Sequence, residues 1–387
     1  MKPPSVVATR LDHIRANLEA IRERVGDRKV LAAVKADGYG HGAVPVSQMI
    51  QDSGAADWLG VANVTEGVEL RVAGIRMPIL KLSVARGDEV AIAVASGIAL
   101  CVVDADSIAE AAVAAGSQGV IAEVHLKVDT GMRRIGCPPE QAPELAKLID
   151  AVPGLRLGGV MSHLPISDSP VGDEFTAAQI ALFKDTVEKV VAARGPIPLV
   201  HLANSGGVLA HPDSWFDMVR PGVMIYGAYP DPEVPRTIAL LPGLEWRSRV
   251  TFVKKVTAGE TVSYGRTWTA EEDTWIATVP IGYGDGYSRL LSNRGRMLIA
   301  GRSYPIAGRV CMDQTMIDLG PQSEVRIGDE VVLVGRTGEE EITTTEIADL
   351  MGTIPYEVTC LITRRVGRDF VRKVPQPGST DRDSLRV

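Results

Sequence analysis

The sequence contains few cysteines, and none of them is arranged to bind a metal or to form a redox pair. Four cysteines occur in 387 residues, and no Cys-x-x-Cys spacing is present. The four are far apart, which argues against zinc sites and disulfide frameworks. We therefore expect free thiols, no metal site and a reducing compartment, the cytoplasm.

The chain also lacks the segments that membrane proteins and nucleic-acid-binding proteins need. The most apolar stretch, residues 90–103, is shorter than the roughly 18 residues that cross a bilayer, and Ser96 and Gly97 interrupt it. Charged residues, Arg10 and Asp12, stand where a secretion signal would be apolar. The net charge is −7, and basic residues are scattered. We expect neither a membrane nor nucleic acid as a partner.

Alternating apolar and amphipathic segments fill the first 238 residues. Helical patterns separate eight apolar runs, and no Gly-x-Gly-x-x-Gly follows the first run, which disfavours a doubly wound sheet. The pattern predicts a (β/α)8 barrel over residues 1–238. The expected strands are 30–35, 58–63, 78–83, 98–103, 121–128, 156–162, 197–203 and 218–226.

The character of the chain changes after a proline-rich linker at residues 230–242. Short segments rich in β-branched and aromatic residues follow, separated by turns that contain glycine. One helix is expected within them, capped by the threonines at 343–345. A chain of 387 residues exceeds one usual hydrophobic core, so we predict a second, mainly β domain over residues 239–387. The last dozen residues, 376–387, are polar and are expected to be disordered.

The ends of the predicted barrel strands carry polar groups that a core does not need. The run VLAAV ends in Lys35, and a lysine in an apolar pocket can lose its proton and become a nucleophile. Taken alone, this segment favours a lysine that reaches water, and Asn204 to Gly207 favours an ordinary helix cap. The other strand-end groups are Lys127, Arg134, His163, His201, Asn204, Ser205, Arg220 and Tyr226.

Eight motifs in one order make a specific resemblance. They are AVKADGYGHG, HLKVDTGMRRIG, HLANSGG, VRPGVMIYG, VSYGRTW, GYGDGY, RVCMDQ and GTIPYE. From about residue 5 to residue 370 the chain resembles the alanine racemases, which are fold-type III enzymes dependent on pyridoxal 5′-phosphate (PLP). The resemblance implies a Schiff base between PLP and Lys35, with Lys35 and Tyr264 as two catalytic bases. It also implies a homodimer in which the partner supplies the tyrosine, and a role in making D-alanine for peptidoglycan.

The resemblance also assigns the remaining site residues. The phosphate positions match Tyr39, Asn204, Ser205, Gly222, Val223 and Tyr356, and the positions near the cofactor ring match Arg134, His163 and Arg220. Met312 matches the residue that binds the substrate carboxylate, and Tyr283 matches one that narrows the entrance. Cys311 and Asp313 flank Met312 in the same motif. Lys127 matches a lysine that is carbamylated in some members. Arg133 stands where many members have glycine or another small residue.

Arg220 discriminates best among PLP enzymes. A carboxylate facing the pyridine nitrogen keeps that nitrogen protonated and makes the ring a strong electron sink. An arginine does not give up its proton, so it can only donate a hydrogen bond to an unprotonated nitrogen. A weaker sink suppresses transamination and suits a reaction that returns the proton promptly.

Three alternatives stay open at this point. An amino-acid decarboxylase of the same architecture would use Cys311, although Arg220 and the lack of a Gly-Gly-Gly phosphate loop oppose it. A PLP-carrying homeostasis protein consists of the barrel alone, whereas this chain has residues 239–387 in addition. A racemase of broader specificity would look similar, and Tyr356 favours alanine over serine. A catabolic role in place of a biosynthetic one would leave the same sequence.

Overall fold

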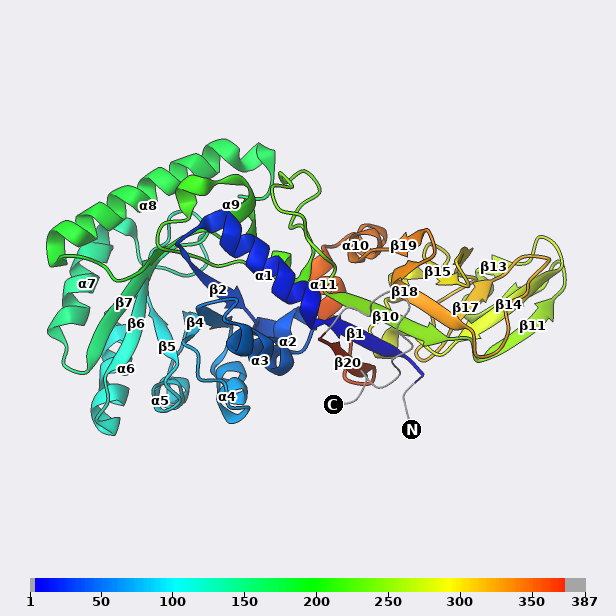
Figure 1. Ribbon diagram of the computed structural model, residues 1–387, viewed down its shortest axis with the longest axis horizontal. Coiled ribbons are helices and arrows are strands. Elements are labelled where there is room, and N and C mark those ends of the chain that lie inside the picture. Colours follow the sequence, from blue (N-terminus) through cyan, green and yellow to red (C-terminus); the bar gives the residue numbers. More distant parts are fainter. Residues whose placement is uncertain (1–3, 373–387) are drawn as a thin grey trace. The chain divides into compact units, whose positions relative to one another are not determined.

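The structure is a computed structural model that describes residues 4–372 (Figure 1). The polar segment 376–387, for which disorder is expected, lies outside the described residues. The chain divides into two compact units. One is Ile14–Leu241, and the other combines Met1–His13 with Pro242–Val387.

The unit Ile14–Leu241 is built on eight parallel strands, which confirms the predicted barrel. In chain order they are β2 (Lys29–Ala33), β3 (Trp58–Val61), β4 (Ile79–Val84), β5 (Ala99–Val102), β6 (Ala122–Lys127), β7 (Leu155–Met161), β8 (Val200–His201) and β9 (Met218–Val219). The spatial order runs from β8 down to β2 and then to β9. Arg220 N donates to Ala203 O at 2.9 Å, so the segments that follow the two edge strands are hydrogen-bonded and the barrel is nearly closed.

Helices surround this sheet in Figure 1. They are α1 (Leu11–Val25), α2 (Lys35–Tyr39), α3 (Ala43–Ser53), α4 (Val64–Val72), α5 (Asp88–Ala95), α6 (Ala105–Gln118), α7 (Ala142–Ala151), α8 (Asp173–Arg194) and α9 (Ser205–Ala210). Short 3-10 helices lie at Pro139–Gln141, Pro170–Gly172, Pro212–Ser214 and Val223–Tyr226. Local sequence explains many of the ends. Asp104, for example, caps α6 by accepting from Ser107 N at 2.7 Å, and Gly119 ends α6 in the left-handed conformation.

The barrel interior combines an apolar cluster with a few buried polar groups. A buried cluster takes residues from nearly every strand: Leu31, Trp58, Leu80, Ala99, Cys101, Met161, Leu199 and Met218. Strand β6 contributes none of them. Its residues Glu123, His125 and Lys127 alternate along the strand and therefore share one face. His125 makes an edge contact with Trp58, with ring centroids 5.4 Å apart, so this polar face borders the apolar cluster.

The second unit is mainly β, as the sequence predicts. A mixed sheet has the order β16-β15-β18-β10-β1-β20, with β19 paired to β18, and two smaller sheets are β11-β14-β17 and β12-β13. The first sheet comprises β1 (Val6–Arg10), β10 (Leu244–Arg249), β15 (Arg296–Ile299), β16 (Arg302–Pro305), β18 (Glu330–Thr337), β19 (Glu340–Ile342) and β20 (Gly367–Val371). The smaller sheets comprise β11 (Phe252–Val256), β12 (Thr261–Val262), β13 (Trp268–Thr269), β14 (Thr274–Val279) and β17 (Thr315–Asp318).

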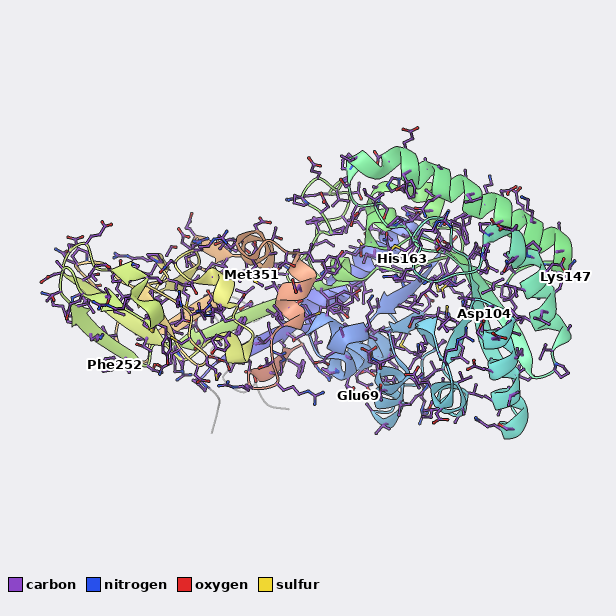
Figure 2. All side chains as sticks on the ribbon, turned by 180° about the vertical axis from the view of Figure 1, so that it is seen from behind. Glu69, Asp104, Lys147, His163, Phe252 and Met351 are labelled. Carbon is purple, nitrogen blue, oxygen red and sulfur yellow. The ribbon has the colours of Figure 1, made fainter. Side chains whose placement is uncertain are left out.

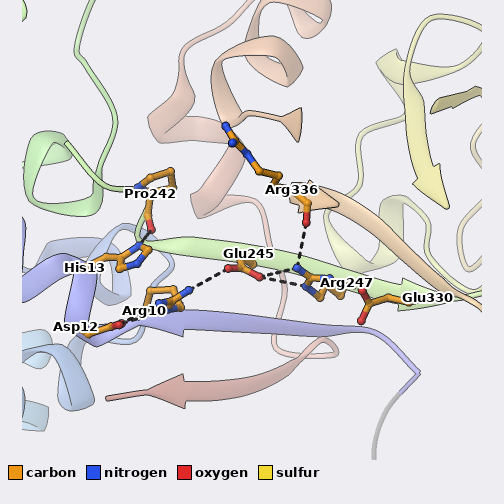
Figure 3. A network of polar contacts seen from close by, with 8 residues as sticks. All are labelled: Arg10, Asp12, His13, Pro242, Glu245, Arg247, Glu330 and Arg336. Carbon is orange, nitrogen blue, oxygen red and sulfur yellow. Dashed lines mark hydrogen bonds and ion pairs between the residues drawn. The ribbon is translucent and has the colours of Figure 1, made fainter. Parts of the chain in front are cut away.

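Strand β1 joins this β unit, although residues 1–238 were assigned to the barrel domain from the sequence. It runs antiparallel to β10 and parallel to β20. Alternating charges accompany β1 and β10 (Figure 3): Arg10 lies 3.2 Å from Glu245, and Arg247 lies 2.9 Å from the same carboxylate. A five-residue strand is too short for its periodicity to reveal which sheet it joins.

Two helices accompany these sheets, where the sequence predicted one. The expected helix is α10 (Thr344–Met351), whose cap Thr343 accepts from Glu346 N at 3.0 Å. The second, α11 (Pro355–Cys360), begins at a proline and has six residues, too few to show a helical period. Several 3-10 turns complete the unit: Tyr264–Arg266, Tyr283–Asp285 and Arg289–Leu291.

The four cysteines are free thiols, as expected. Cys101 and Cys137 are buried, Cys311 is half-buried, and Cys360 is exposed. Within residues 4–372, no group of three or more His, Cys, Asp or Glu side chains is arranged to hold a metal ion. In the same part of the chain, no helix has both the length and the apolar character needed to cross a bilayer.

Candidate active site

Lys35 follows β2 and opens an unusual turn. Left-handed backbone is costly for residues with a Cβ, by roughly 1–2 kcal/mol each, and normally occurs at single positions. Here five consecutive residues adopt it: Ala36 (φ 52°), Asp37 (φ 52°), Gly38 (φ 62°), Tyr39 (φ 54°) and Gly40 (φ 81°). Such strain persists only where the surroundings hold it, and it concentrates at functional sites.

Two carboxylates hold the turn in place. Glu66 Oε1 accepts from Ala36 N at 2.7 Å, and its Oε2 accepts from Ala62 N at the end of β3, also at 2.7 Å. Asp37 Oδ1 accepts from Ala43 N at 2.8 Å and ties the turn to the start of α3. Lys35 is therefore held at the C-terminal end of its strand.

Tyr39, Ser205 and Gly222 form a cradle suited to an anion. Ser205 Oγ accepts from Gly222 N at 2.9 Å, and Lys35 Nζ lies 5.8 Å from the centre of the Tyr39 ring. A Cβ added to Gly222 would lie 2.6 Å from the Tyr39 hydroxyl, so only glycine allows this approach. Ser205 begins α9, and Val223 begins the next 3-10 helix. The first N–H groups of a helix have no partner within it and attract anions.

Asn204 is the N-cap of α9. Its Oδ1 accepts from Gly207 N at 3.0 Å and from Ser167 Oγ at 2.7 Å, while Nδ2 donates to Leu164 O at 3.0 Å. The side chain therefore fixes where the helix begins. Its contact with a cofactor stays a prediction.

Arg220 is a buried cation immediately after β9, with 6% of its surface exposed. Nη2 donates to Ser162 O at 2.6 Å and to Leu202 O at 3.0 Å, and Nη1 lies 2.9 Å from His201 Nδ1. Its Nε–H makes no hydrogen bond to the residues from 4 to 372. Burial lowers the pKa of Arg220 to about 10, which leaves the guanidinium charged at neutral pH. The site thus contains a fixed cation whose Nε–H is an unused donor.

His163, labelled in Figure 2, follows β7. Its Nδ1 lies 3.4 Å from Arg220 Nη2. Burial and the Arg220 guanidinium hold the pKa of His163 well below its usual range, so the imidazole is neutral.

Lys127, at the end of β6, is only 6% exposed. Its ammonium has one long hydrogen bond, to Leu82 O at 3.4 Å. Burial, together with the cations Arg220, Arg134 and Lys35, lowers the pKa of Lys127 to about 8. Arg134 itself is exposed. The neighbouring Arg133 has φ 55°, a left-handed conformation that favours glycine.

In the β unit, the residues named from the sequence line one cavity of about 1120 Å³. These are Tyr264, Tyr283, Cys311, Met312 and Asp313. The Tyr264 side chain is 72% exposed, and Met312 is 52% exposed.

Backbone strain also surrounds Tyr264. Ser263 (φ 68°) and Arg266 (φ 50°) are both left-handed. Ser263 Oγ lies 3.5 Å from Cys311 Sγ, and Arg365 Nη2 donates to Asp313 Oδ1 at 2.6 Å. The site residue Tyr356 is half-buried at the start of α11 in the same unit.

The structure thus assembles two sets of predicted residues, one in each unit. Sequence reasoning missed several residues of the barrel set. Glu66, Glu123 and His125 received no role, and His201 was named only as a polar strand residue. The alternation of Glu123, His125 and Lys127 along one strand is the signal that could have revealed Glu123 and His125.

The fold and these residues define a class: a two-part protein with a parallel barrel, basic side chains at the strand ends, and an added β domain. Family models give the particular family. The model described as "Alanine racemase, N-terminal domain" matches residues 9–230, and "Alanine racemase, C-terminal domain" matches residues 243–370. The chain belongs to the alanine racemase family.

Individual relatives agree. The chain is 52% identical to the alanine racemase of Cutibacterium acnes, over 95% of this chain and 98% of the relative. It is 42% identical to that of Symbiobacterium thermophilum, over 95% and 97%. Among solved structures, the alanine racemase of Streptomyces coelicolor A3(2) is 34% identical, with a TM-score of 0.90 over 96% of this chain and 98% of that one.

We expect Lys127 to make the stability of the protein depend on pH in buffer free of CO2. The pKa of Lys127 is about 8 in the folded chain against 10.5 for a free lysine, so between these values the unfolded chain binds more protons. Stability should therefore rise with pH across this window, by roughly 2–3 kcal/mol in total. The measurement is urea unfolding of the wild-type protein and of Lys127→Met from pH 7.5 to 10.5.

The wild type should gain stability relative to Lys127→Met as the pH rises. The exposed Lys147→Met is the control and should differ from the wild type by the same amount at every pH. A constant difference for Lys127→Met as well would contradict a neutral, buried amine.

Proposed function

We propose that this protein is a PLP-dependent racemase that interconverts L-alanine and D-alanine. The observation that carries the proposal is the buried Arg220 in the same barrel-edge site as Lys35, where decarboxylases of this architecture would need a carboxylate. Similarity to alanine racemases along nearly the whole chain supports it.

The barrel residues fit PLP. Tyr39, Ser205, Gly222 and Val223 would hold the phosphate, because Gly222 lets the Tyr39 hydroxyl approach the backbone beside Ser205. Asn204 would support this cradle through the start of α9, and Tyr356 would contribute from the β unit. When bound, PLP supplies an electron sink that makes the α-hydrogen of an amino acid acidic.

The remaining barrel residues would hold and tune the ring. Lys35 would bind PLP through its ε-amine, and the unused Nε–H of Arg220 would donate to the ring nitrogen. A neutral His163 can pack beside the ring without adding charge. Arg134 would approach the phenolic oxygen. Because Arg220 keeps its proton at neutral pH, it would only donate to the ring nitrogen, and the bound cofactor would be a weak electron sink.

Inverting a stereocentre needs a proton donor or acceptor on each face of the α-carbon. Lys35 would serve one face and Tyr264 the other. Met312 would bind the substrate carboxylate through its backbone N–H, and Tyr283 would narrow the entrance.

Tyr264 would come from the partner subunit of a homodimer. Its 72% exposure, at the edge of a cavity lined by Met312 and Tyr283, supports a role completed by a second copy. The neighbours Cys311 and Asp313 would shape this surface. The cytoplasm, where free thiols persist, would be the compartment, and peptidoglycan synthesis the main use of D-alanine. A catabolic use of alanine remains the alternative role.

We also propose that Lys127 is carbamylated. A lysine with a pKa of about 8 has enough neutral amine to react with CO2, and the charged groups that lower its pKa are all cations. The product is an anion that would hold Arg134. In bicarbonate, the intact mass of the native protein should be one CO2 above the mass calculated from its sequence, and Lys127→Met should show no such addition. A bare amine at Lys127 would contradict the proposal.

Purified protein incubated with L-alanine in D2O should yield D-alanine that carries deuterium at the α-carbon, with no release of CO2. Chiral chromatography and mass spectrometry follow chirality and deuteration together. A PLP-loaded protein that leaves alanine unchanged but racemises another amino acid would move the proposal to a broader racemase. Release of CO2 would favour the decarboxylase, and Cys311→Ala would then be the variant to test.

Tyr264→Phe should keep the cofactor bound and slow racemisation from the L-alanine side by roughly 100-fold or more, because one of the two bases is lost. Lys35→Ala should remove both the visible absorbance of bound cofactor and turnover. Tyr304→Phe, a matched change on β16 away from the cavity, should leave both unchanged. Unchanged rates in both directions for Tyr264→Phe would refute the two-base assignment.

A further inference from the structure

A chain of polar side chains crosses the barrel interior to reach Arg220. At its outer end, Arg156 Nη2 donates to Glu123 Oε2 at 2.6 Å. Glu123 Oε1 then lies 3.5 Å from His125 Nε2, and His125 Nδ1 lies 2.8 Å from His201 Nε2. The last contact is the one from Arg220 Nη1 to His201 Nδ1 at 2.9 Å.

Burial divides this chain into an outer and an inner part. Arg156 is 67% exposed and Glu123 22% exposed, whereas both histidines are fully buried. The carboxylate is the last group that water reaches. His125 Nε2 makes no hydrogen bond of good geometry within residues 4–372, and Glu123 Oε1 is the acidic oxygen beside it.

Arg220 fixes the direction of every hydrogen bond in the chain. A guanidinium only donates, so His201 Nδ1 must accept and its proton must lie on Nε2. That proton is donated to His125 Nδ1, which places the His125 proton on Nε2, facing Glu123. Both rings are then neutral Nε2–H tautomers. Every contact from the Arg220 cation to the Glu123 carboxylate then pairs one donor with one acceptor.

The charge states agree with this assignment. Burial lowers the pKa of His125, and burial together with Arg220 holds the pKa of His201 well below its usual range. Contact with His125 lowers the pKa of Glu123, so this carboxylate is ionised at neutral pH.

Two glycines on the neighbouring strand β7 make room for the chain. A Cβ at Gly158 would lie 2.2 Å from Glu123 Oε1, and a Cβ at Gly159 would lie 2.6 Å from Leu199 O and 2.7 Å from His125 Nδ1. Neither glycine has a positive φ, so space accounts for them. An apolar barrel core would not need buried imidazoles.

We propose that Glu123 and His125 are positioning residues that act through His201 to hold Arg220 in its donating orientation. The inference rests on the proposed function, because it concerns the residue that would face the ring nitrogen. Glu123 Oε1, 3.5 Å from His125 Nε2, is the acidic oxygen that faces the last proton of the chain. Without it, the Nε2–H of His125 is buried with no acceptor, and the tautomer that His201 needs is no longer enforced from that end.

The first test needs no variant and no turnover. Selective 15N labelling of histidine in the cofactor-free protein gives six imidazoles to assign by NMR. His125 and His201 should both be neutral Nε2–H tautomers at neutral pH, with a coupling across the N–H···N bond between them. An Nδ1–H tautomer or a doubly protonated ring at either position would overturn the proposal.

The second test compares three variants. Glu123→Leu should give a mixture of His125 tautomers and, in the cofactor-loaded enzyme, lower kcat for alanine roughly tenfold with little change in KM. Glu123→Gln keeps an acceptor oxygen and should restore the tautomers and most of kcat. Arg156→Ala removes the same surface ion pair and should alter neither.

Equal losses in Arg156→Ala and Glu123→Leu would show a merely structural surface bridge and refute the proposal, as would wild-type tautomers and kcat in Glu123→Leu. If Glu123→Leu does not fold, Glu123→Gln and the wild-type spectrum still decide. The NMR result is independent of turnover, so it separates failure of this proposal from failure of the racemase function.

Discussion

The barrel site depends on the burial of one guanidinium. Removing a cation such as Arg220 from water is costly unless its donors are satisfied. Two carbonyls, Ser162 O and Leu202 O, and the His201 ring meet most of that demand. These acceptors come from the ends of β7 and β8, whereas Arg220 follows β9. The site therefore exists only where the barrel brings these three strands together. The polar face of β6 follows from the same need. His201 accepts from Arg220 through Nδ1, so its Nε2–H requires an acceptor, and His125 on β6 supplies it.

Strain is concentrated where chemistry is expected. The left-handed turn after Lys35 and the left-handed residues beside Tyr264 are both costly conformations in positions without a regular helix or strand. Glu66 and Asp37 offset part of that cost at Lys35 through hydrogen bonds to backbone N–H groups. The result is a lysine whose position is set by backbone geometry.

Much of this could be predicted from the sequence, because the signals are local. Eight apolar runs separated by helical patterns suffice for a barrel, and the change of character after the proline-rich linker suffices for a β domain. The strand-end residues Lys35, Lys127 and Arg220 follow, since parallel strands bring their C-terminal ends together. The roles of individual residues came from motif resemblance and stay predictions for this chain.

The sequence by itself therefore determined the fold class, the family and the set of strand-end side chains. Only the tertiary structure decided which groups touch. Strand β1 joins a sheet formed by residues more than two hundred positions away. The pattern of its five residues does not indicate that β10 and β20 are its neighbours. Likewise, the contact of His125 with His201 depends on the register of neighbouring strands and on the space that Gly159 leaves. Such contacts are non-local, so no periodicity along the chain encodes them.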